Sequence, residues 1–253
     1  MTLLLVDVGN TRIKWARVVR GRRQRLRSEA LRDDGAAVFR ALLRAVPAGT
    51  QVLAVNVAGG AVERALAAAA RAATLPPPRF LRSSERAAGI VNGYTEAWRL
   101  GADRWAALIG ARHALGERAA CIVGVGTAMT LDLLDARGRH RGGYIVPGPT
   151  LAVDTLLRNT HGIRRRLRGG TRARRPLPGW PRSTRDAVAD GSREACAAMI
   201  LRCHADARRR LGGAPRLVLT GGAAPDLLPL LPAATIHLPD LVLHGVQVAF
   251  GGA

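Results

Sequence analysis

The sequence of 253 residues predicts an α/β protein made of two related halves, each with a mixed β-sheet flanked by helices. The chain opens on an apolar run that ends in a Gly-Asn-Thr turn, at residues 3–14. A similar apolar run with a Gly-Thr turn recurs at residues 121–132, and a third such turn follows the run at 217–222. This duplication predicts two domains, 1–117 and 118–253.

The formal net charge is +21, a value that usually indicates a nucleic acid or another anionic partner. Here nearly all the positive charge is arginine, since Lys14 is the only lysine, in a chain also rich in alanine and glycine. A GC-rich coding sequence produces that bias. The densest clusters, residues 164–168 and 172–175, nearly lack the aromatic side chains that stack on bases. We therefore expect arginine-covered, solvated surfaces and no nucleic-acid partner.

No run is long and apolar enough to cross a bilayer, and the chain begins on a strand without a basic leader, so we expect a cytoplasmic protein. Its cysteines show no CxxC spacing and are expected to be reduced. Cys196 and Cys203 share one helix face, which favours buried packing over metal binding.

The first half is expected to follow the order β-β-α-β-α-β and then a helix. The expected elements are a hairpin at 3–19, a helix at 35–46 capped by Asp33 or Asp34, a strand at 52–57, a helix from 58–60 to about 73, a strand at 79–81 and a helix at 106–115.

The second half is expected to begin with another hairpin and to end in strand–helix units. The expected elements are a hairpin at 120–135, a strand at 142–148, a helix at 150–157, a loop at 162–181, a helix at 183–211, a strand at 216–219, a helix at 223–231, a strand at 235–238 and a closing helix from 239.

The first turn carries the residue types that suit the phosphates of a nucleotide. Gly9 allows backbone N–H groups to approach a ligand, Thr11 can donate to an oxyanion, and Asp7 can hold a hydrated Mg²⁺. The turn alone is also compatible with an ordinary hairpin.

Five ordered motifs extend over nearly the whole chain. They are Asp7-Val8-Gly9-Asn10-Thr11, Gly101-Ala102-Asp103-Arg104, Gly126-Thr127-Ala128-Met129-Thr130, Gly142-Gly143-Tyr144-Ile145-Val146-Pro147-Gly148 and Thr220-Gly221-Gly222. With these motifs the chain resembles the actin-like ATPase and sugar-kinase superfamily, in which the nucleotide lies in the cleft between two ribonuclease-H-like domains. Within that superfamily it is similar to the type III pantothenate kinases.

The resemblance implies ATP-dependent phosphorylation of the primary hydroxyl of pantothenate, the first step of coenzyme A synthesis, by a homodimer that uses Mg²⁺ and a monovalent cation, K⁺ or NH₄⁺. It assigns Asp103 as the general base. The residues that it implies around ATP are Asp7, Val8, Gly9, Asn10, Thr11, Arg12, Ile13, Lys14 and Thr127. Those that it implies around pantothenate are Tyr94, Gly101, Ala102, Asp103, Arg104 and Thr184.

These roles agree with the chemistry of the residue types. Phosphoryl transfer needs positioning and charge neutralisation, and a carboxylate in reach of the hydroxyl can take its proton. The guanidinium of Arg104 offers paired donors for a carboxylate or amide oxygen. Asp103 also stands at the start of a predicted helix, where an acid can serve only to stabilise the helix dipole.

Two positions depart from the family's pattern. Gly124 stands where many members carry the aspartate that binds the monovalent cation, so a potassium site here has to rest on backbone carbonyls or on another acid such as Asp132, or it is absent. The metal ligands are therefore not assigned, apart from Asp7 as a water-mediated Mg²⁺ ligand. Ala97 replaces a proline between Tyr94 and the second motif, which affects the path of that loop.

Three alternatives stay open. The first is a regulatory or nucleic-acid-associated accessory factor that keeps the fold without catalysis, using the basic loop. The second is a kinase of the same superfamily that acts on a sugar or another small alcohol. The third is an actin-like interaction module that binds ATP without phosphorylating an acceptor.

Overall fold

The computed structural model describes residues 2–166 and 179–251, and it confirms the predicted α/β class with mixed sheets flanked by helices. The chain forms two compact units. The first contains Met1–Glu117, Arg137–Arg141 and Asp240–Ala253, and the second contains Arg118–Ala136 and Gly142–Pro239. The predicted domain boundary after residue 117 stays a proposal. Within the described residues, no helix combines the length and apolarity that crossing a bilayer requires.

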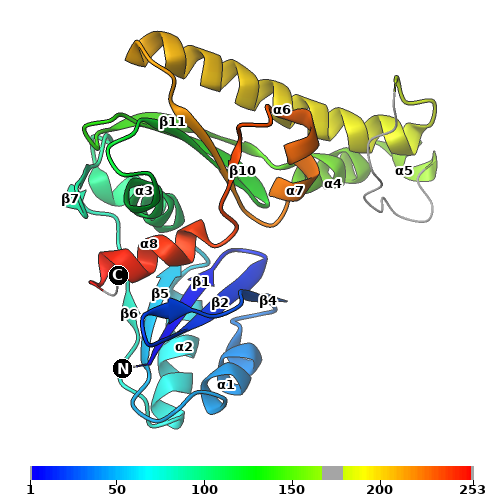
Figure 1. Ribbon diagram of the computed structural model, residues 1–253. Helices are drawn as coiled ribbons and strands as arrows, with labels where there is room; N and C mark the ends of the chain where they lie inside the picture. Colours follow the sequence, from blue (N-terminus) through cyan, green and yellow to red (C-terminus); the bar gives the residue numbers. More distant parts are fainter. Residues whose placement is uncertain (1, 167–178, 252–253) are drawn as a thin grey trace. The chain divides into compact units, whose positions relative to one another are not determined.

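The first unit contains a mixed sheet in the order β3-β2-β1-β5-β6, with β4 paired to β2. Strand β1 is antiparallel to β2 and parallel to β5 (Figure 1). The elements of this unit are β1 Leu3–Val8, β2 Arg12–Val19, β3 Arg22–Arg23, β4 Arg27–Ala30, α1 Ala36–Arg44, β5 Gln51–Asn56, α2 Gly60–Ala72, β6 Arg79–Phe80, β7 Arg86–Ala87, β8 Ile90–Val91, a 3₁₀ turn Ala97–Arg99, α3 Ala102–Leu115 and α8 Leu241–Ala249.

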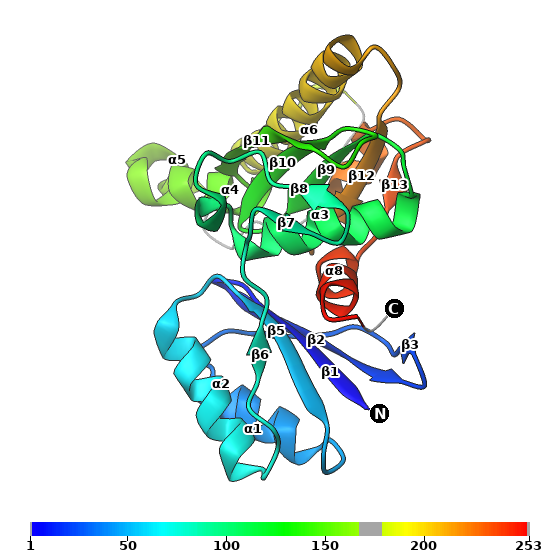
Figure 2. The ribbon, with the colours of Figure 1, turned by 90° about the vertical axis from the view of Figure 1, so that its left-hand side faces the viewer.

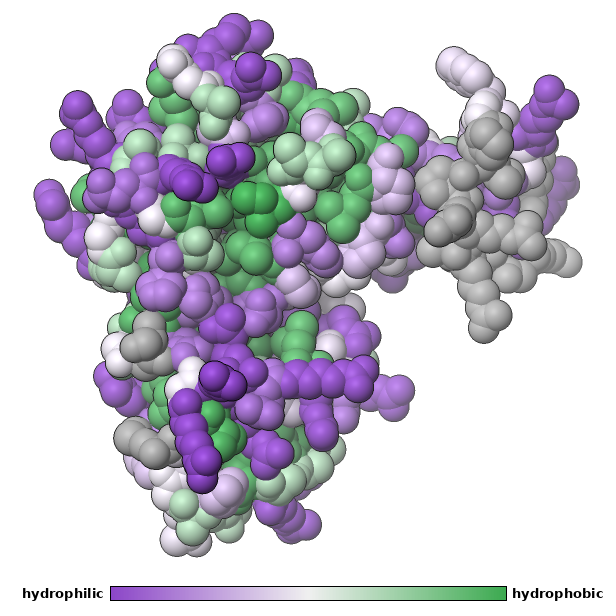
Figure 3. Space-filling view, viewed as in Figure 1, coloured by the Kyte–Doolittle hydropathy of each residue, from purple (hydrophilic) through white to green (hydrophobic). Residues whose placement is uncertain are grey.

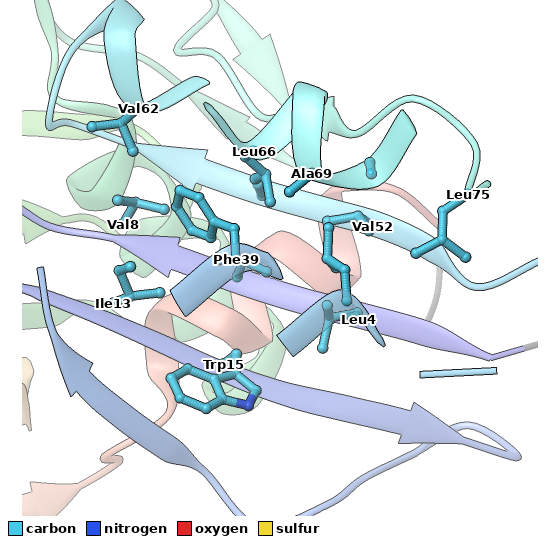
Figure 4. Close-up of a cluster of buried hydrophobic side chains, with 14 residues drawn as sticks. Leu4, Val8, Ile13, Trp15, Phe39, Val52, Val62, Leu66, Ala69 and Leu75 are labelled. Atoms are coloured by element: carbon cyan, nitrogen blue, oxygen red, sulfur yellow. The ribbon is translucent and has the colours of Figure 1, made fainter. Parts of the chain in front are cut away.

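The helices α1 and α2 cover one face of this sheet. Phe39 of α1 and Leu66 of α2 pack with Leu4 and Val8 of β1 in one buried apolar cluster (Figure 4). Because side chains alternate along a strand, Asp7 points to the opposite face of the sheet from Val8. The apolar core thus fixes the register of β1 and, with it, the side on which the Asp7 carboxylate lies.

The pair of helices α3 and α8 is built on two glycines. A Cβ at Gly110 of α3 would lie 2.5 Å from the carbonyl oxygen of Leu241, and one at Gly245 of α8 would overlap the carbonyl oxygen of Ala106. Helix α3 is buried around most of its circumference from Arg104 to Ala111. Backbone contact between the two helices therefore anchors α3 within the first unit.

The second unit contains a sheet in the order β11-β10-β9-β12-β13 (Figure 2). Strand β9 is antiparallel to β10 and parallel to β12. The elements are β9 Ala120–Val125, β10 Ala128–Leu134, β11 His140–Pro147, α4 Pro149–Asn159, α5 His161–Arg166, α6 Thr184–Leu211, β12 Arg216–Thr220, α7 Ala224–Leu227, a 3₁₀ turn Leu228–Leu230 and β13 Ile236–His237. The first two residues of β11 belong to the first unit.

The three cysteines confirm the packing prediction. Cys196 and Cys203 lie on one face of α6 and join Cys121 of β9 in the buried apolar cluster of the second unit. All three are free thiols. Desolvation raises the pKa of Cys121 to about 12, so this thiol stays protonated and unreactive near neutral pH.

The predicted loop at 162–181 is wrong in its first part, where α5 continues to Arg166. Glycine signals at both ends of the segment outweighed a run of arginines, which are good helix formers. Residues 167–178, with most of the arginine cluster, lie outside the described part of the chain. The short strands β3, β4, β7 and β8 were also not predicted, since two to four residues carry little periodicity.

The cap of α1 lies one residue from the predicted position. Its N-cap is Gly35, while the carboxylate of Asp34 accepts a hydrogen bond of 3.0 Å from the backbone N–H of Ala36. Arg17, Arg22 and Arg27 are solvent-exposed side chains of the β2–β4 region, and the face of the molecule drawn in Figure 3 is largely hydrophilic there. The predicted arginine-covered surface is thus confirmed for this region.

Candidate active site

The first predicted phosphate turn connects β1 to β2. Its N–H at Gly9 donates a 3.0 Å hydrogen bond to the carbonyl of Arg12, which closes the turn. The carbonyl oxygen of Thr11 accepts a hydrogen bond of 2.9 Å from the N–H of Leu31. Asn10 and Thr11 are exposed at the bend. The turn is thus held by its own backbone, and its polar tip faces outward, as a ligand-binding turn requires.

Asp7 has an unusual electrostatic environment. Its side chain is 10% exposed, and its Oδ2 lies 3.7 Å from Nζ of Lys14, its cross-strand partner. Burial raises the pKa of Asp7 to about 6, the charge of Lys14 opposes that rise, and the nearby negative charge of Asp103 adds to it. A buried carboxylate beside a second carboxylate favours a bound cation, which fits the predicted role for Mg²⁺.

Asp103 lies in the first turn of α3, behind the N-cap Gly101. Its Oδ1 accepts a 2.8 Å hydrogen bond from the backbone N–H of Arg104. A Cβ at Gly101 would stand only 2.8 Å from the same oxygen, so a glycine at this position leaves room for the carboxylate. The helix N-terminus stabilises the ionised form, which a general base requires. The position is thus compatible with both the catalytic and the helix-dipole interpretation, and the proximity to Asp7 favours the catalytic one.

Arg104 and Tyr94 form a pair in the same unit. The Nη1 of Arg104 donates a 2.7 Å hydrogen bond to the hydroxyl oxygen of Tyr94, and its guanidinium carbon lies 5.4 Å from the centre of the ring. Arg104 is only 4% exposed. The structure thus brings together two of the residues predicted to line the acceptor site.

The loop that carries Tyr94 is held by Asn92, which the sequence analysis did not single out. The carboxamide oxygen of Asn92 accepts a hydrogen bond of 3.0 Å from the N–H of Tyr94, and its nitrogen donates one of 3.1 Å to the carbonyl oxygen of Ala97. Tyr94 therefore reaches Arg104 although alanine replaces proline at position 97. The Asn92-Gly93 dipeptide is a turn signal of the Asx type, and it could have identified this residue.

In the second unit, three glycine-containing turns meet at one end of the sheet. The N–H of Gly126 donates a hydrogen bond of 3.0 Å to the carbonyl oxygen of Ala128. The N–H of Gly148 donates one of 2.9 Å to the carbonyl oxygen of Thr127. Gly221, with φ of +102°, packs against the backbone of Val125 so closely that a Cβ would overlap its carbonyl oxygen. The third, fourth and fifth motifs thus lie side by side. Thr127 is exposed at this site.

Thr184 is the first residue of α6, directly after its N-cap Ser183. It is half-buried, and it belongs to the second unit together with Thr127. Asp7, Tyr94, Asp103 and Arg104 all belong to the first unit. The predicted site residues are therefore divided between the two units.

A side chain at position 124 has little space. A Cβ there would lie 2.8 Å from Oγ1 of Thr130, its partner on β10. Asp132 follows two residues along the same face of β10 and is 3% exposed. In the part of the chain that the structure describes, no three His, Cys, Asp or Glu side chains gather as a metal site. The residues present therefore do not fit a carboxylate-built potassium site at Gly124.

The family model described as "Type III pantothenate kinase" matches residues 3–206. The chain belongs to this family. A type III pantothenate kinase of Aromatoleum aromaticum is 40% identical over 97% of this chain and 96% of the relative. One of Halorhodospira halophila is 39% identical over 96% of this chain and 95% of the relative.

Solved structures support the same fold for this type III pantothenate kinase family member. A Campylobacter jejuni protein described as a Baf family transcriptional activator has a TM-score of 0.60 and 18% identity, over 98% of this chain and 97% of that one. A ROK family glucokinase of Streptomyces griseus, solved with glucose and AMPPNP, has a TM-score of 0.53 and 13% identity, over 99% of this chain and 100% of that one. Both likenesses concern the fold alone.

Proposed function

We propose that the protein transfers the γ-phosphoryl group of ATP to the primary hydroxyl of pantothenate, forming 4′-phosphopantothenate and ADP in the cytoplasm. The membership in the type III pantothenate kinase family supports this reaction. The observation that supports the proposal most is that the negative charge of Asp103 helps to raise the pKa of Asp7, because the candidate base then lies near a candidate nucleotide residue of the same unit.

In this proposal the residues around the first turn hold and orient ATP. Asp7 would hold a hydrated Mg²⁺, which would supply positive charge for the phosphates, and Lys14, 3.7 Å from Asp7, and the turn 9–12 would bind the phosphate oxygens. Thr127 of the second unit contributes a hydroxyl to the same nucleotide. The buried Asp7 carboxylate is then balanced by positive charge on both sides.

The acceptor alcohol is positioned by the pair of Arg104 and Tyr94, by the backbone of residues 101–102 and by Thr184. Arg104 suits the carboxylate or amide oxygen of pantothenate because its donors are planar and fixed. The carboxylate of Asp103 takes the proton of the attacking hydroxyl as the new P–O bond forms and the bond to the ADP oxygen breaks.

The decisive experiment measures the conversion of pantothenate and ATP to 4′-phosphopantothenate and ADP by the purified protein. A panel of other alcohols and sugars tests the neighbouring kinase activities. No turnover with any acceptor, combined with salt-dependent retention on DNA at physiological ionic strength, would instead support the accessory-factor alternative.

We predict that Asp103→Asn lowers kcat at least about 10²-fold while ATP binding is nearly unchanged, because a general base contributes on this scale. Steady-state kinetics and isothermal titration with ATP measure the two quantities. Glu63→Gln is a matched control, since Glu63 is also an acid in the first turn of a helix of the same unit. Near-wild-type turnover of Asp103→Asn would exclude Asp103 as the general base. The helix-dipole interpretation of this residue would then remain.

The requirement for a monovalent cation is a separate proposal. The family resemblance favours activation by K⁺ or NH₄⁺, but Gly124 supplies no carboxylate and Thr130 occupies the space beside it. We propose that K⁺ still activates the enzyme through oxygen atoms of the backbone or of Asp132. Equal turnover in buffers with K⁺, NH₄⁺ and Na⁺ would contradict this proposal.

We also propose that the protein is a homodimer. Strand β11 is an edge strand of the second sheet, and it exposes Tyr144 at 49% and Ile145 at 61%. Exposed apolar side chains on an edge strand are typical of an interface. Sedimentation equilibrium is expected to give a dimer for the wild type and a shift toward monomer for Ile145→Lys. A wild-type monomer at micromolar concentration would contradict the proposal.

A further inference from the structure

The connection between β10 and β11 interlocks with the hairpin β7–β8 inside the first unit. The N–H of Val91 donates a hydrogen bond of 2.9 Å to the carbonyl oxygen of Gly138, and Val91 forms a parallel β-bridge with Arg139. A Cβ at Gly138 would overlap the carbonyl oxygen of Gly89. Residues 137–141 are thus fixed against the segment that leads to Tyr94.

His140, the first residue of β11, is the residue of the segment 137–141 that packs on Tyr94. The two rings are stacked, with centroids 5.8 Å apart and an interplanar angle of 16°. His140 is only 3% exposed. Gly93, the neighbour of Tyr94, packs on the backbone of His140 so tightly that a Cβ would overlap its carbonyl oxygen. Both the ring and the backbone of His140 therefore limit where Tyr94 can lie.

The packing of His140 on Tyr94 affects the hydroxyl group of Tyr94, which Arg104 also contacts. This oxygen accepts a hydrogen bond from Nη1 of Arg104, so its own hydrogen is directed to another acceptor. A hydrogen bond from a cation strengthens the hydroxyl as a donor. The Tyr94 phenol, held between Arg104 and His140, is thereby prepared to donate to an oxygen of the acceptor substrate.

We propose that His140 is a positioning residue, which acts through Tyr94 and Arg104 to bind the acceptor alcohol. This inference rests on the proposed function, because it assigns a role within the acceptor site. His140 does not touch the reacting atoms in this proposal. Its effect is on the affinity for the acceptor, and the phosphoryl-transfer step and ATP are not affected.

The kinetic test compares His140→Ala with His140→Phe. His140→Ala is expected to raise the KM for pantothenate about 3- to 10-fold, the range that corresponds to the loss of one aromatic pair. Its kcat and its KM for ATP stay within about twofold of the wild type. His140→Phe keeps a flat ring and is expected to restore the wild-type KM. His113→Ala, which removes a ring paired with His244 in the same unit, is the matched control.

A second measurement does not depend on activity. The chain contains only two tyrosines, Tyr94 and Tyr144, so fluorotyrosine-labelled protein with Tyr144→Phe gives a single ¹⁹F signal from Tyr94. His140→Ala is expected to shift this signal and narrow it through faster ring motion. His140→Phe is expected to leave it close to the wild type, and His113→Ala is expected to leave it unchanged.

The two measurements separate the possible failures. If the wild type does not phosphorylate pantothenate but the ¹⁹F signal responds to His140→Ala alone, the proposed function fails and the positioning of Tyr94 stands. If the wild type is active and His140→Ala has an unchanged KM for pantothenate, the inference is overturned. An equal loss of kcat and melting temperature in His140→Ala and His113→Ala would also overturn it, since both residues would then be merely structural.

Discussion

Asp7 combines a cost to stability with the proposed role in ATP binding. Its carboxylate is buried, and its pKa of about 6 lies above the ordinary value of 3.8. The folded state therefore binds a proton more tightly than the unfolded state, and wild-type stability falls as the pH rises from 3.8 to about 6. A residue that destabilises the free protein in this way is typical of a binding site.

We predict that Asp7→Asn stabilises the free protein by about 1–2 kcal/mol at pH 7, because the amide has a similar shape and carries no charge to bury. The same change is expected to weaken Mg²⁺-ATP binding at least about 10-fold, because an amide is a poorer ligand for the cation. Urea unfolding at pH 7 and pH 4 and calorimetric titration measure the two effects. An unchanged affinity of Asp7→Asn for Mg²⁺-ATP would contradict the assignment of Asp7 to the nucleotide site.

At the scale of single residues, the sequence indicated which residue types form the candidate site, but it did not indicate all the side chains that contact them. The motif around Asp7 was sufficient to suggest a phosphate turn, and the second motif suggested Asp103. Their proximity depends on the packing of α3 against the sheet, which no local pattern encodes. His140 was missed for a similar reason, since it lies outside every motif and reaches Tyr94 only through the fold.

At the scale of elements, the crossing of α3 and α8 depends on two residues without a side chain. Sequence periodicity predicted both helices, with bounds close to those observed. It did not predict their contact, because a glycine inside a helix usually indicates weak helix formation. Gly110 and Gly245 are explained only by the closeness of the two backbones.

We predict that Gly245→Ala destabilises the protein by about 1–3 kcal/mol, the usual cost of overpacking a close contact. Gly191→Ala is the matched control, because Gly191 lies within α6 and a Cβ there would meet nothing within 4 Å. This control is expected to gain about 0.5–1 kcal/mol from higher helix propensity. Chemical denaturation of both variants provides the comparison, and equal effects would contradict the proposed crossing.

Helix α8 is also held by a polar cluster. Nη1 of Arg23 lies 2.5 Å from Nδ1 of His244, and Nε of Arg23 donates 2.8 Å to Asp240. Nε2 of His244 lies 3.0 Å from Nδ1 of His113. Because arginine can only donate, Nδ1 of His244 is the acceptor and the ring is neutral. Burial, Arg23 and His113 lower the pKa of His244 to about 4.

We predict that this cluster makes stability depend on pH. The folded pKa of about 4 lies below the ordinary value of 6.5, so the contribution of His244 is present above pH 6.5 and is lost as the pH falls toward 4. The loss between pH 7 and pH 5 is expected to be about 1 kcal/mol, a figure discounted for the partial exposure of the group. Urea unfolding of His244→Gln should show a smaller loss over the same interval.

At the scale of the whole molecule, the duplicated turns predicted two related halves. The family membership supports the reaction, and each unit organises its own group of motif residues. The duplication was readable in the sequence because both copies keep an apolar run before a glycine turn. The segments 137–141 and 240–253, which join the first unit from later in the chain, carry no signal of that kind.

We predict that Thr127→Ala raises the KM for ATP about 10-fold or more, since a hydrogen bond to a charged group is worth about 1.5–3 kcal/mol. The KM for pantothenate is expected to change little. Thr155→Ala removes an exposed hydroxyl on α4 of the same unit and serves as the control. If Thr127→Ala and Thr155→Ala both leave the KM for ATP unchanged, the second unit does not hold the phosphates through this hydroxyl.

The place of α8 in the first unit has a consequence for biosynthesis. A ribosome that adds about 5–20 residues per second completes the sheet of β1, β2 and β5 well before it makes Leu241–Ala249. Until then the backbone of α3 at Gly110 lacks the helix that packs on it. The first unit is consequently expected to close only after the second unit has been synthesised.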